Sequence, residues 1–259
     1  MNPLIITATI ANSWLNPQVK FPTTPDEIAE TAKRCQQEGA SIVHFHATGQ
    51  WKETIKAIKK KTNILIQSGM SSLQIEERKE VFDEHSDMIS IILGHHDEAF
   101  PNNDVYVLHS REELEKYSRL CIDNRVKPEF ELWHSGHIWN LEYLIDKDLL
   151  KKPYYVTLFF GWPGGNWSPP TVNEYLYRRT LLPDNCLVSV SIMGAEQPKI
   201  ISAAITNGDH VRIGTEDYPF LKVGEPKEPW ELVAWTKDLA NLYGREVSTV
   251  SETRKTLNI

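Results

Sequence analysis

Residues 3–14 read PLIITATIANSW. The apolar, β-branched run over residues 3–10 is typical of a strand that is covered on both faces in a parallel sheet. A doubly wound open sheet would normally place a glycine-rich turn directly after such a first strand, whereas residues 9–14 contain no glycine. This stretch therefore favours a closed parallel barrel over an open sheet.

Seven similar runs follow the first one and alternate with helical patterns. The eight predicted strands cover residues 3–10, 41–46, 63–67, 88–93, 126–132, 154–160, 186–192 and 210–214. Capping signals predict helix starts at residues 24–27, 71–74 and 110–113, helix ends near Gly39 and Gly244, and a last strong helix over residues 229–243. Strands and helices in this alternation predict an α/β fold, a (β/α)8 TIM barrel, and 259 residues are a common length for one barrel. We therefore expect a single barrel domain over residues 1–259.

The composition is that of an ordinary globular protein, with 41% hydrophobic and 24% charged residues. The formal net charge of −7 argues against a nucleic-acid-binding surface, although a local arginine can still bind a small anion. No apolar run approaches the roughly 20 residues that cross a bilayer, and the first residues do not read as a secretory signal. The three cysteines, Cys35, Cys121 and Cys186, are scattered, which fits a reducing compartment. We therefore expect a soluble, cytoplasmic protein.

Two histidines end the second predicted strand. Functional side chains of a barrel gather at the C-terminal ends of its strands, and residues two apart on a strand share a face. His44 and His46 can therefore both point into the barrel mouth, where such a pair is a familiar metal clamp. The alternative interpretation is a pair of histidines that are hydrogen-bonded within a polar core.

The eighth predicted strand ends in a third possible ligand. Arg212 and Glu216 share parity, so both should face the same way if the strand continues that far. Strands two and eight both flank strand one in a closed barrel, about 10 Å apart, so Glu216 can complete a site of two histidines and one carboxylate. The alternative is a structural Arg212–Glu216 pair at the barrel rim.

Other polar residues follow the middle strands. Glu129 and Glu131 share a face within an apolar stretch, and a carboxylate there needs a cation, a donor or a proton. The loop over residues 161–165 (GWPGG) can either bring backbone N–H groups to an anion or form a plain tight turn. The rival metal ligands, each more typical of a loop histidine, are His95, His96, His134 and His137.

Five segments in this order resemble the β-keto acid cleavage enzyme family, whose best-known activity is 3-keto-5-aminohexanoate cleavage. They are residues 3–8 (PLIITA), 39–46 (GASIVHFH), 128–131 (PEFE), 161–165 (GWPGG) and 208–217 (GDHVRIGTED). The resemblance implies a (β/α)8 barrel, a homo-oligomer and a zinc ion held by His44, His46 and Glu216. It also implies a reaction in which a β-keto acid and acetyl-CoA give acetoacetate and a new acyl-CoA.

The resemblance also assigns roles to individual residues. The family's catalytic pair falls on Arg212 and Asp217, and its substrate-contacting positions fall on Glu131, Ser90 and Ser68. An arginine lowers the pKa of a neighbouring carboxylate, so Asp217 should stay ionised and can act as a base. Trp14 stands where the aminohexanoate-cleaving members carry an acidic residue, and an ammonium group can instead lie against an indole face.

Two other functions fit parts of the pattern. A metal-dependent hydrolase on a barrel would normally place its histidine pair on the first strand and add histidines from strands five and six, so it predicts His134 at the metal. A diverged, non-catalytic barrel that binds a metabolite would explain the short stretch that follows the histidine pair, residues 47–51, where family members usually carry a longer polar segment.

Overall fold

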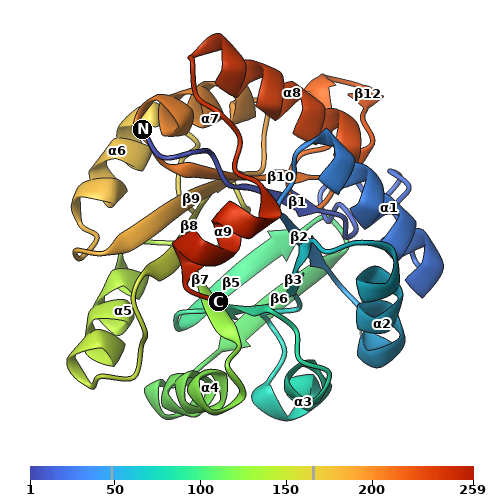
Figure 1. Cartoon of the computed structure of the whole chain (residues 1–259). Helices are drawn as coiled ribbons and strands as arrows, with labels where there is room; N and C mark the ends of the chain where they lie inside the picture. The colour runs from blue at the N-terminus through green and yellow to red at the C-terminus, as the bar shows by residue number, and fades with distance from the viewer. Residues whose placement is uncertain (48, 165–166) are drawn as a thin grey trace.

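Eight parallel strands close into a barrel in the computed structural model, which describes residues 1–47, 49–164 and 167–259 (Figure 1). Around the barrel the strands follow the order β1-β10-β9-β8-β7-β4-β3-β2. Their bounds are β1 (Ile6–Thr9), β2 (Ile42–Phe45), β3 (Leu65–Ser68), β4 (Met88–Ile92), β7 (Lys127–Leu132), β8 (Tyr154–Phe160), β9 (Cys186–Ile192) and β10 (His210–Gly214). Each strand overlaps one of the eight predicted runs, which confirms the predicted TIM barrel.

Helices surround the barrel and bury the outward-facing side chains of its strands (Figure 1). They are α1 (Pro25–Glu38), α2 (Trp51–Lys61), the 3-10 helix η1 (Ile75–Arg78), α3 (Lys79–Asp83), α4 (Arg111–Asn124), α5 (Gly136–Asp146), α6 (Val172–Thr180), α7 (Gln197–Thr206), α8 (Pro229–Leu242) and α9 (Val250–Leu257). Within the described ranges, none of the helices is long and apolar enough to cross a membrane.

The capping predictions are confirmed at two helix starts and wrong at a third. Thr24 caps α1 in a full capping box with Glu27, and the Ser110 side chain accepts a hydrogen bond from the Glu113 N–H at the start of α4. At residues 71–74, however, Gln74 is the N-cap of η1. The Ser71 hydroxyl instead donates a hydrogen bond to the Glu131 carboxylate in the barrel mouth. The sequence pattern at residues 71–74 therefore marks part of a site.

Helix α9, which the sequence pattern did not predict, closes the N-terminal end of the barrel. Its Leu257 is fully buried against Ile5, Ile42 and Leu65, the first inward-facing residues of three strand segments. Figure 1 is viewed from this end, and α9 crosses the middle of the barrel there. The opposite, C-terminal end of the barrel is therefore where a ligand can enter.

A second unpredicted element covers that C-terminal end. Strands β5 (His95–Phe100) and β6 (Asn103–Leu108) form an antiparallel hairpin between β4 and α4. Alternate residues of a strand share a face, and His96, Glu98 and Phe100 are the buried ones. The Ala99 N–H donates to the Pro163 carbonyl at 3.1 Å, which ties the hairpin to the loop after β8. A shorter hairpin, β11 (Phe220–Lys222) with β12 (Glu225–Pro226), follows β10.

Candidate active site

A narrow cavity of about 60 Å³ opens at the C-terminal end of the barrel. Its lining comes from the strand ends, from the loop after β3 and from the β5–β6 hairpin. The residues are Trp14, His46, Met70, Ser71, Ser72, Glu98, Phe100, Val105, Glu131, Trp133, Phe159, Trp162, Arg212 and Glu216. One side is aromatic and the other is charged, so the cavity suits a small ligand with an apolar or cationic end and an anionic end.

His44, His46 and Glu216 meet at the charged side. The two Nε2 atoms lie 3.3 Å apart, and Glu216 places Oε2 at 3.2 Å from His44 Nε2 and Oε1 at 3.5 Å from His46 Nε2. The side chains come from the end of β2 and from the residues just after β2 and β10. Both strands pair with β1, since Thr9 lies opposite His44 on one side and Gly214 on the other. The predicted convergence of these three residues is confirmed, and together they can hold a metal ion.

Two glycines make room for this group. A Cβ at Gly69 would lie 2.5 Å from His46 Cδ2 and 2.6 Å from His44 Nε2. Gly214 has a φ of 156°, and a Cβ there would lie 1.9 Å from the Thr9 carbonyl oxygen. A side chain at Gly69 would displace the imidazoles, and one at Gly214 would push β10 away from β1 and move Glu216.

The surroundings of the two imidazoles fit a cation between them. His44 Nδ1 lies 3.0 Å from Gln67 Oε1, and since that oxygen can only accept, Nδ1 donates and the ring directs Nε2 at the point it shares with His46 and Glu216. Burial lowers the pKa of His46 to about 4, even though Glu216 opposes that shift, so His46 is neutral. Two imidazole nitrogens and a carboxylate oxygen therefore face one point. Zinc and similar divalent ions bind such a set of three ligands and keep coordination positions open for a substrate.

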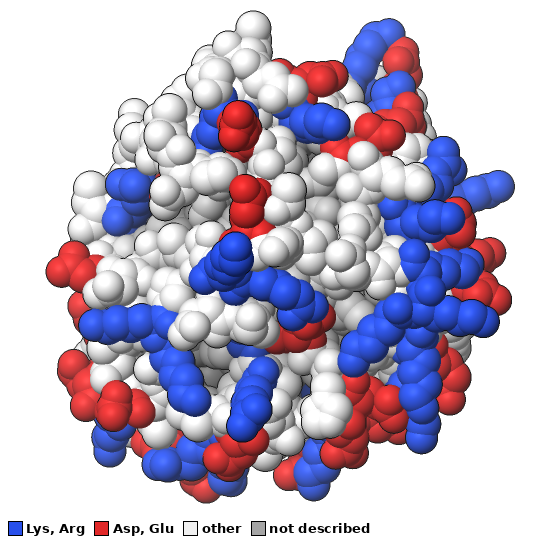
Figure 2. Space-filling model, viewed as in Figure 1, with Lys and Arg blue, Asp and Glu red and all other residues white. Residues whose placement is uncertain are grey.

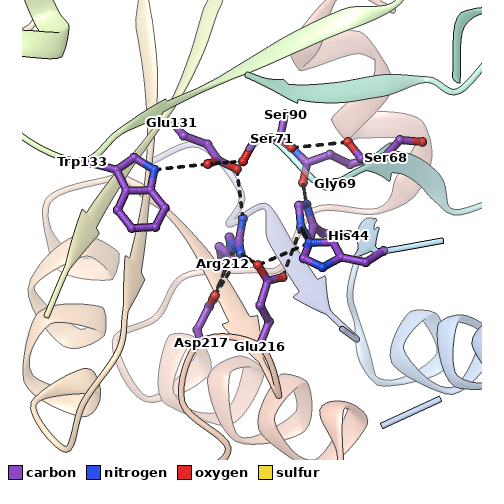
Figure 3. A network of polar contacts seen from close by, with 12 residues as sticks. His44, Ser68, Gly69, Ser71, Ser90, Glu131, Trp133, Arg212, Glu216 and Asp217 are labelled. Atoms are coloured by element: carbon purple, nitrogen blue, oxygen red, sulfur yellow. Dashed lines mark hydrogen bonds and ion pairs between the residues drawn. The ribbon is translucent and has the colours of Figure 1, made fainter. Parts of the chain in front are cut away.

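Arg212 links this group to two further carboxylates (Figure 3). Its Nη2 lies 2.8 Å from Glu216 Oε1 and 3.0 Å from Asp217 Oδ1, and its Nη1 lies 3.7 Å from Glu131 Oε1. Burial disfavours the charge on Arg212, but Asp217, Glu216 and Glu131 outweigh it and raise its pKa. Burial likewise opposes ionisation of Glu216, and Arg212 with the two histidines still lowers its pKa. Nη1 is buried without a hydrogen-bond partner, so it is free to donate to a ligand in the cavity.

Asp217 lies behind Arg212 as seen from the cavity. Its side chain is fully buried and both its oxygens contact the guanidinium, at 3.2 and 3.3 Å from Nε. Arg212 lowers the pKa of Asp217 as expected from the sequence, but burial, the largest cause, and the charge of Glu216 outweigh it and raise that pKa to about 6. Asp217 is thus placed to fix the orientation of Arg212.

The carboxylate of Glu131 faces the cavity and is held by two donors. Ser71 Oγ donates to Oε2 at 2.7 Å, and Trp133 Nε1 donates to the same oxygen at 3.2 Å. Glu129, two residues earlier on β7, lies deeper, where burial and the charge of Glu131 raise its pKa to about 8. The neighbouring carboxyls of β7 therefore differ in role: Glu131 is exposed to a ligand, and Glu129 is a protonated group of the barrel interior.

The two predicted serine contacts have different surroundings. Ser90 shares a face of β4 with Met88 and Ile92, which both point into the barrel, and its hydroxyl donates to the Ser68 carbonyl at 3.4 Å. Ser68 points the other way, because Gln67 occupies the inward position of β3 beside His44. The Ser68 hydroxyl lies 3.0 Å from the Ser86 hydroxyl, outside the barrel. The structure does not bring the Ser68 side chain into the cavity, and Ser71 supplies a hydroxyl there.

The rival histidines lie apart from the group of His44, His46 and Glu216. His134 and His137 pack against each other, with His134 Nδ1 accepting from the Gly136 N–H at 3.1 Å. His96 Nε2 lies 2.9 Å from Glu98 Oε1, and its ring stacks on Trp133 at 4.2 Å. The hydrolase interpretation predicts His134 at the metal, and this placement contradicts it.

The loop over residues 161–164 acts as a tight turn that supports the hairpin, while Gly165 lies outside the described residues. A Cβ at Gly164, whose φ is 141°, would lie 2.0 Å from the Asp97 carbonyl oxygen. The glycine therefore lets the turn after β8 approach the backbone of β5. The turn holds the hairpin, and with it Glu98, over the barrel mouth.

Sequence reasoning missed Glu98, because it gave no strand to residues 95–108. The alternation of His96, Glu98 and Phe100 with exposed residues is the signal that could have revealed the hairpin. Burial raises the pKa of Glu98 well above its usual value, with Glu131 and Glu216 adding to the shift, and burial lowers the pKa of His96 to about 4. An uncharged acid–imidazole pair thus faces the aromatic side of the cavity.

Comparison with known proteins gives a consistent result. The family model described as beta-keto acid cleavage enzyme matches residues 3–259. A 3-keto-5-aminohexanoate cleavage enzyme of Acetoanaerobium sticklandii is 30% identical over 282 residues, covering 100% of this chain and 99% of that protein. A 3-dehydrocarnitine:acetyl-CoA trimethylamine transferase of Rhizobium meliloti is 23% identical, covering 97% of this chain and 94% of that protein.

Solved structures share the barrel at lower identity. One described as the apo structure of ObcA superposes with a TM-score of 0.74 at 14% identity, covering 92% of this chain, which spans 65% of that longer chain. A dihydropteroate synthase from Coxiella burnetii superposes with a TM-score of 0.59 at 14% identity, covering 93% of this chain and 92% of that one. At these identities the two likenesses support the fold alone.

Proposed function

Because the chain belongs to the β-keto acid cleavage enzyme family, we propose that it converts a β-keto acid and acetyl-CoA to acetoacetate and a new acyl-CoA. In this reaction the bond between C2 and C3 of the β-keto acid breaks. Its acyl part leaves as an acyl-CoA, and its carboxymethyl part joins the acetyl group to form acetoacetate. The observation that carries the proposal is the group of His44, His46 and Glu216 beside Nη1 of Arg212, which has no hydrogen-bond partner among the described residues.

We assign the metal site to zinc, held by His44, His46 and Glu216. A bound zinc ion with open positions polarises a carbonyl oxygen as a Lewis acid. The fit rests on the two imidazole Nε2 atoms and the ionised carboxylate that face one point, with burial keeping His46 neutral and Gln67 orienting the ring of His44.

Arg212 binds the anionic part of the substrate. Its free Nη1 faces the cavity, and a preorganised donor of this kind stabilises the negative oxygen that develops during carbon–carbon cleavage. Asp217 holds Nε and Nη2 in place, and its carboxylate accepts a proton from Arg212 as Arg212 takes up the proton from C2 of the β-keto acid. The pair therefore combines orientation with proton transfer.

Glu131 and the serines position the substrate. Ser71 and Trp133 fix the Glu131 carboxylate toward the cavity, where it can accept a hydrogen bond from a substrate hydroxyl or enol. Ser90 lies deeper in the barrel than Glu131, on the inward face of β4, and its hydroxyl donates to the Ser68 carbonyl below the cavity. In place of Ser68, whose side chain lies outside the barrel, we assign the substrate-facing hydroxyl to Ser71.

The aromatic side of the cavity receives the side chain of the β-keto acid. Trp14 stacks on Phe100 at 5.6 Å, and the Glu98 carboxyl reaches the same space. Aromatic faces attract cations, and a buried carboxyl gains a counter-charge from a cationic nitrogen. The names of two relatives, with an aminohexanoate and a trimethylamine, agree with this chemistry. We therefore propose a short β-keto acid whose side chain carries a positively charged nitrogen.

The test is acetoacetate release by the purified, zinc-loaded protein from acetyl-CoA and a panel of β-keto acids. The panel pairs each amino-bearing acid with a hydroxyl-bearing one of the same length. Release of acetoacetate together with the matching acyl-CoA supports the proposed reaction. Absence of acetoacetate across the whole panel contradicts it. The homo-oligomer and the reducing cytoplasm stay predictions from the sequence.

A further inference from the structure

A larger cavity, of about 300 Å³, lies at the other end of the barrel. The end of α4, the start of β7, the loop between α5 and β8, and the last two residues enclose it. The lining residues are Ser118, Cys121, Ile122, Arg125, Val126, Lys127, Pro128, Leu149, Leu150, Lys151, Asn258 and Ile259. Its volume falls at the lower end of the range for small-molecule pockets.

The wall of this cavity is mostly apolar. Cys121, Val126, Leu149 and Leu150 are all buried beneath it, with at most 8% of their surface exposed. Such a wall favours the short hydrocarbon part of a ligand, since each buried methylene contributes about 0.8 kcal/mol.

Three positive side chains from separate segments surround this wall, and no acidic side chain lines it. Arg125 ends α4, Lys127 begins β7, and Lys151 precedes β8. Lys127 is only 7% exposed, and its Nζ donates to the Lys151 carbonyl at 3.1 Å. Among the described residues, none of the three forms an ion pair, and against their three positive charges the lining holds one negative group, the terminal carboxylate of Ile259. In a chain with a formal net charge of −7, this is a local excess of positive charge.

The backbone at Arg125 points to the same conclusion. Arg125 is the C-cap of α4 and has a φ of 56°, in the left-handed region that helix C-caps usually give to glycine or asparagine. An arginine there accepts backbone strain and sets a guanidinium at the rim of the cavity. Lys127 also lacks a counter-ion among the described residues, so burial and then the charge of Lys151 lower its pKa to about 8.

Basic side chains also lie on the face of the molecule around the cavity. Figure 2 looks onto the N-terminal end of the barrel and shows Lys and Arg side chains near its middle, over α9 and beside the C-terminus, with Asp and Glu side chains among them. A positively charged surround attracts anions and raises their local concentration. A ligand bound here would not compete with a substrate at His44, because the two cavities lie at opposite ends of the strands.

We propose that this cavity binds a small organic anion, with its anionic head against Arg125, Lys127 and Lys151 and its short apolar body against Val126 and the leucines. A carboxylate and a phosphate head share this chemistry, since both accept several charge-assisted hydrogen bonds. The proposal is independent of the reaction assigned to the barrel mouth.

The test is equilibrium dialysis of the full-length protein at pH 7 against hexanoate, hexyl phosphate, hexanamide and inorganic phosphate. We expect hexanoate or hexyl phosphate to bind at one site per chain, and the tighter of the two to identify the head group. Hexanamide should bind at least about tenfold more weakly, because it lacks the charge. Equal binding of hexanamide, equal binding of inorganic phosphate, or no binding of either organic anion would overturn the proposal.

Two variants locate the site. Arg125→Gln and Lys127→Met should each weaken binding of the preferred anion by about tenfold or more, which is the effect of losing one charge-assisted hydrogen bond. Arg125 is exposed, so Arg125→Gln keeps the test valid if Lys127→Met does not fold. Lys199→Met, on the exposed face of α7, is the matched control and should leave binding unchanged. Binding that is the same in both cavity variants lies at another site and contradicts the proposal.

Discussion

The two ends of the barrel differ in how their charges are balanced. At the C-terminal end, one arginine, Arg212, lies among three carboxylates, so negative charge is in excess. His44, His46 and Glu216 face one point there and can hold a cation. At the N-terminal end, Arg125, Lys127 and Lys151 surround a cavity without an acidic side chain. The excess of negative charge at the C-terminal end favours a cation, and the excess of positive charge at the N-terminal end favours an anion.

The largest expected effect tests the buried ion pair at the mouth. Asp217→Asn should lower kcat by about a thousandfold with little change in KM, because it removes the proton acceptor and leaves the substrate contacts of Arg212 and Glu131 in place. Steady-state kinetics of acetoacetate release measure this split. Asp217→Glu should restore part of kcat. A rise in KM with an unchanged kcat would instead limit Asp217 to substrate binding.

Arg212→Lys should lower kcat by about a hundredfold, because a lysine keeps the charge but cannot contact Glu216 and Asp217 while directing a second donor into the cavity. Circular dichroism should show an intact fold. Arg254→Lys is the control at the other end, where Arg254 pairs with Asp87 on a partly exposed surface. Equal losses in the two variants would show that the effect is general destabilisation.

Glu98→Gln should change substrate preference and not the chemistry. We expect kcat/KM to fall by about tenfold for β-keto acids with a positively charged nitrogen and to change little for the hydroxyl-bearing partners, because glutamine keeps the size of the side chain but cannot ionise. Competition between paired acids measures this ratio. Glu142→Gln, on the exposed side of α5, is the control. A fall of the same size for both members of a pair would exclude charge recognition by Glu98.

The smallest effect concerns stability at the barrel interior. Glu129 has a pKa of about 8 in the folded protein, against an ordinary value of 4.5, so the folded state binds a proton that the unfolded state releases. The stabilising contribution is complete below about pH 4.5 and is lost as the pH rises toward 8. Relative to Glu129→Gln, the wild type should lose on the order of a few kcal/mol of unfolding free energy over this interval. Parallel pH profiles of the two proteins would contradict the assignment.

The barrel and the meeting of His44, His46 and Glu216 were predictable because both follow from short-range patterns in the sequence. Eight apolar runs gave the strands, and the two-residue spacing of His44 and His46 placed both in the mouth. Glu216 followed from the closure of the barrel, since β10 and β2 both pair with β1. These inferences needed only the alternation of side chains along a strand and the order of the strands around the barrel.

Other parts of the site depend on contacts that no local pattern contains. Ser68 was placed in the site by a resemblance, but its neighbour Gln67 takes the inward position, which leaves the Ser68 hydroxyl against Ser86. The pKa of Asp217 depends on how completely the surrounding residues bury it, and the rise caused by this burial exceeds the lowering caused by Arg212. Glu98 enters the cavity only because a hairpin interrupts the alternation of strands and helices.

The most direct test of the account is zinc content measured together with activity. Protein stripped of metal and titrated with zinc should gain acetoacetate-forming activity in proportion to bound zinc, up to one ion per chain. His44→Ala should lose both the tightly bound ion and the activity, whereas His134→Ala should keep both, because His134 lies outside the metal-binding group. Full activity in metal-free protein, or an unchanged zinc content in His44→Ala, would contradict the account.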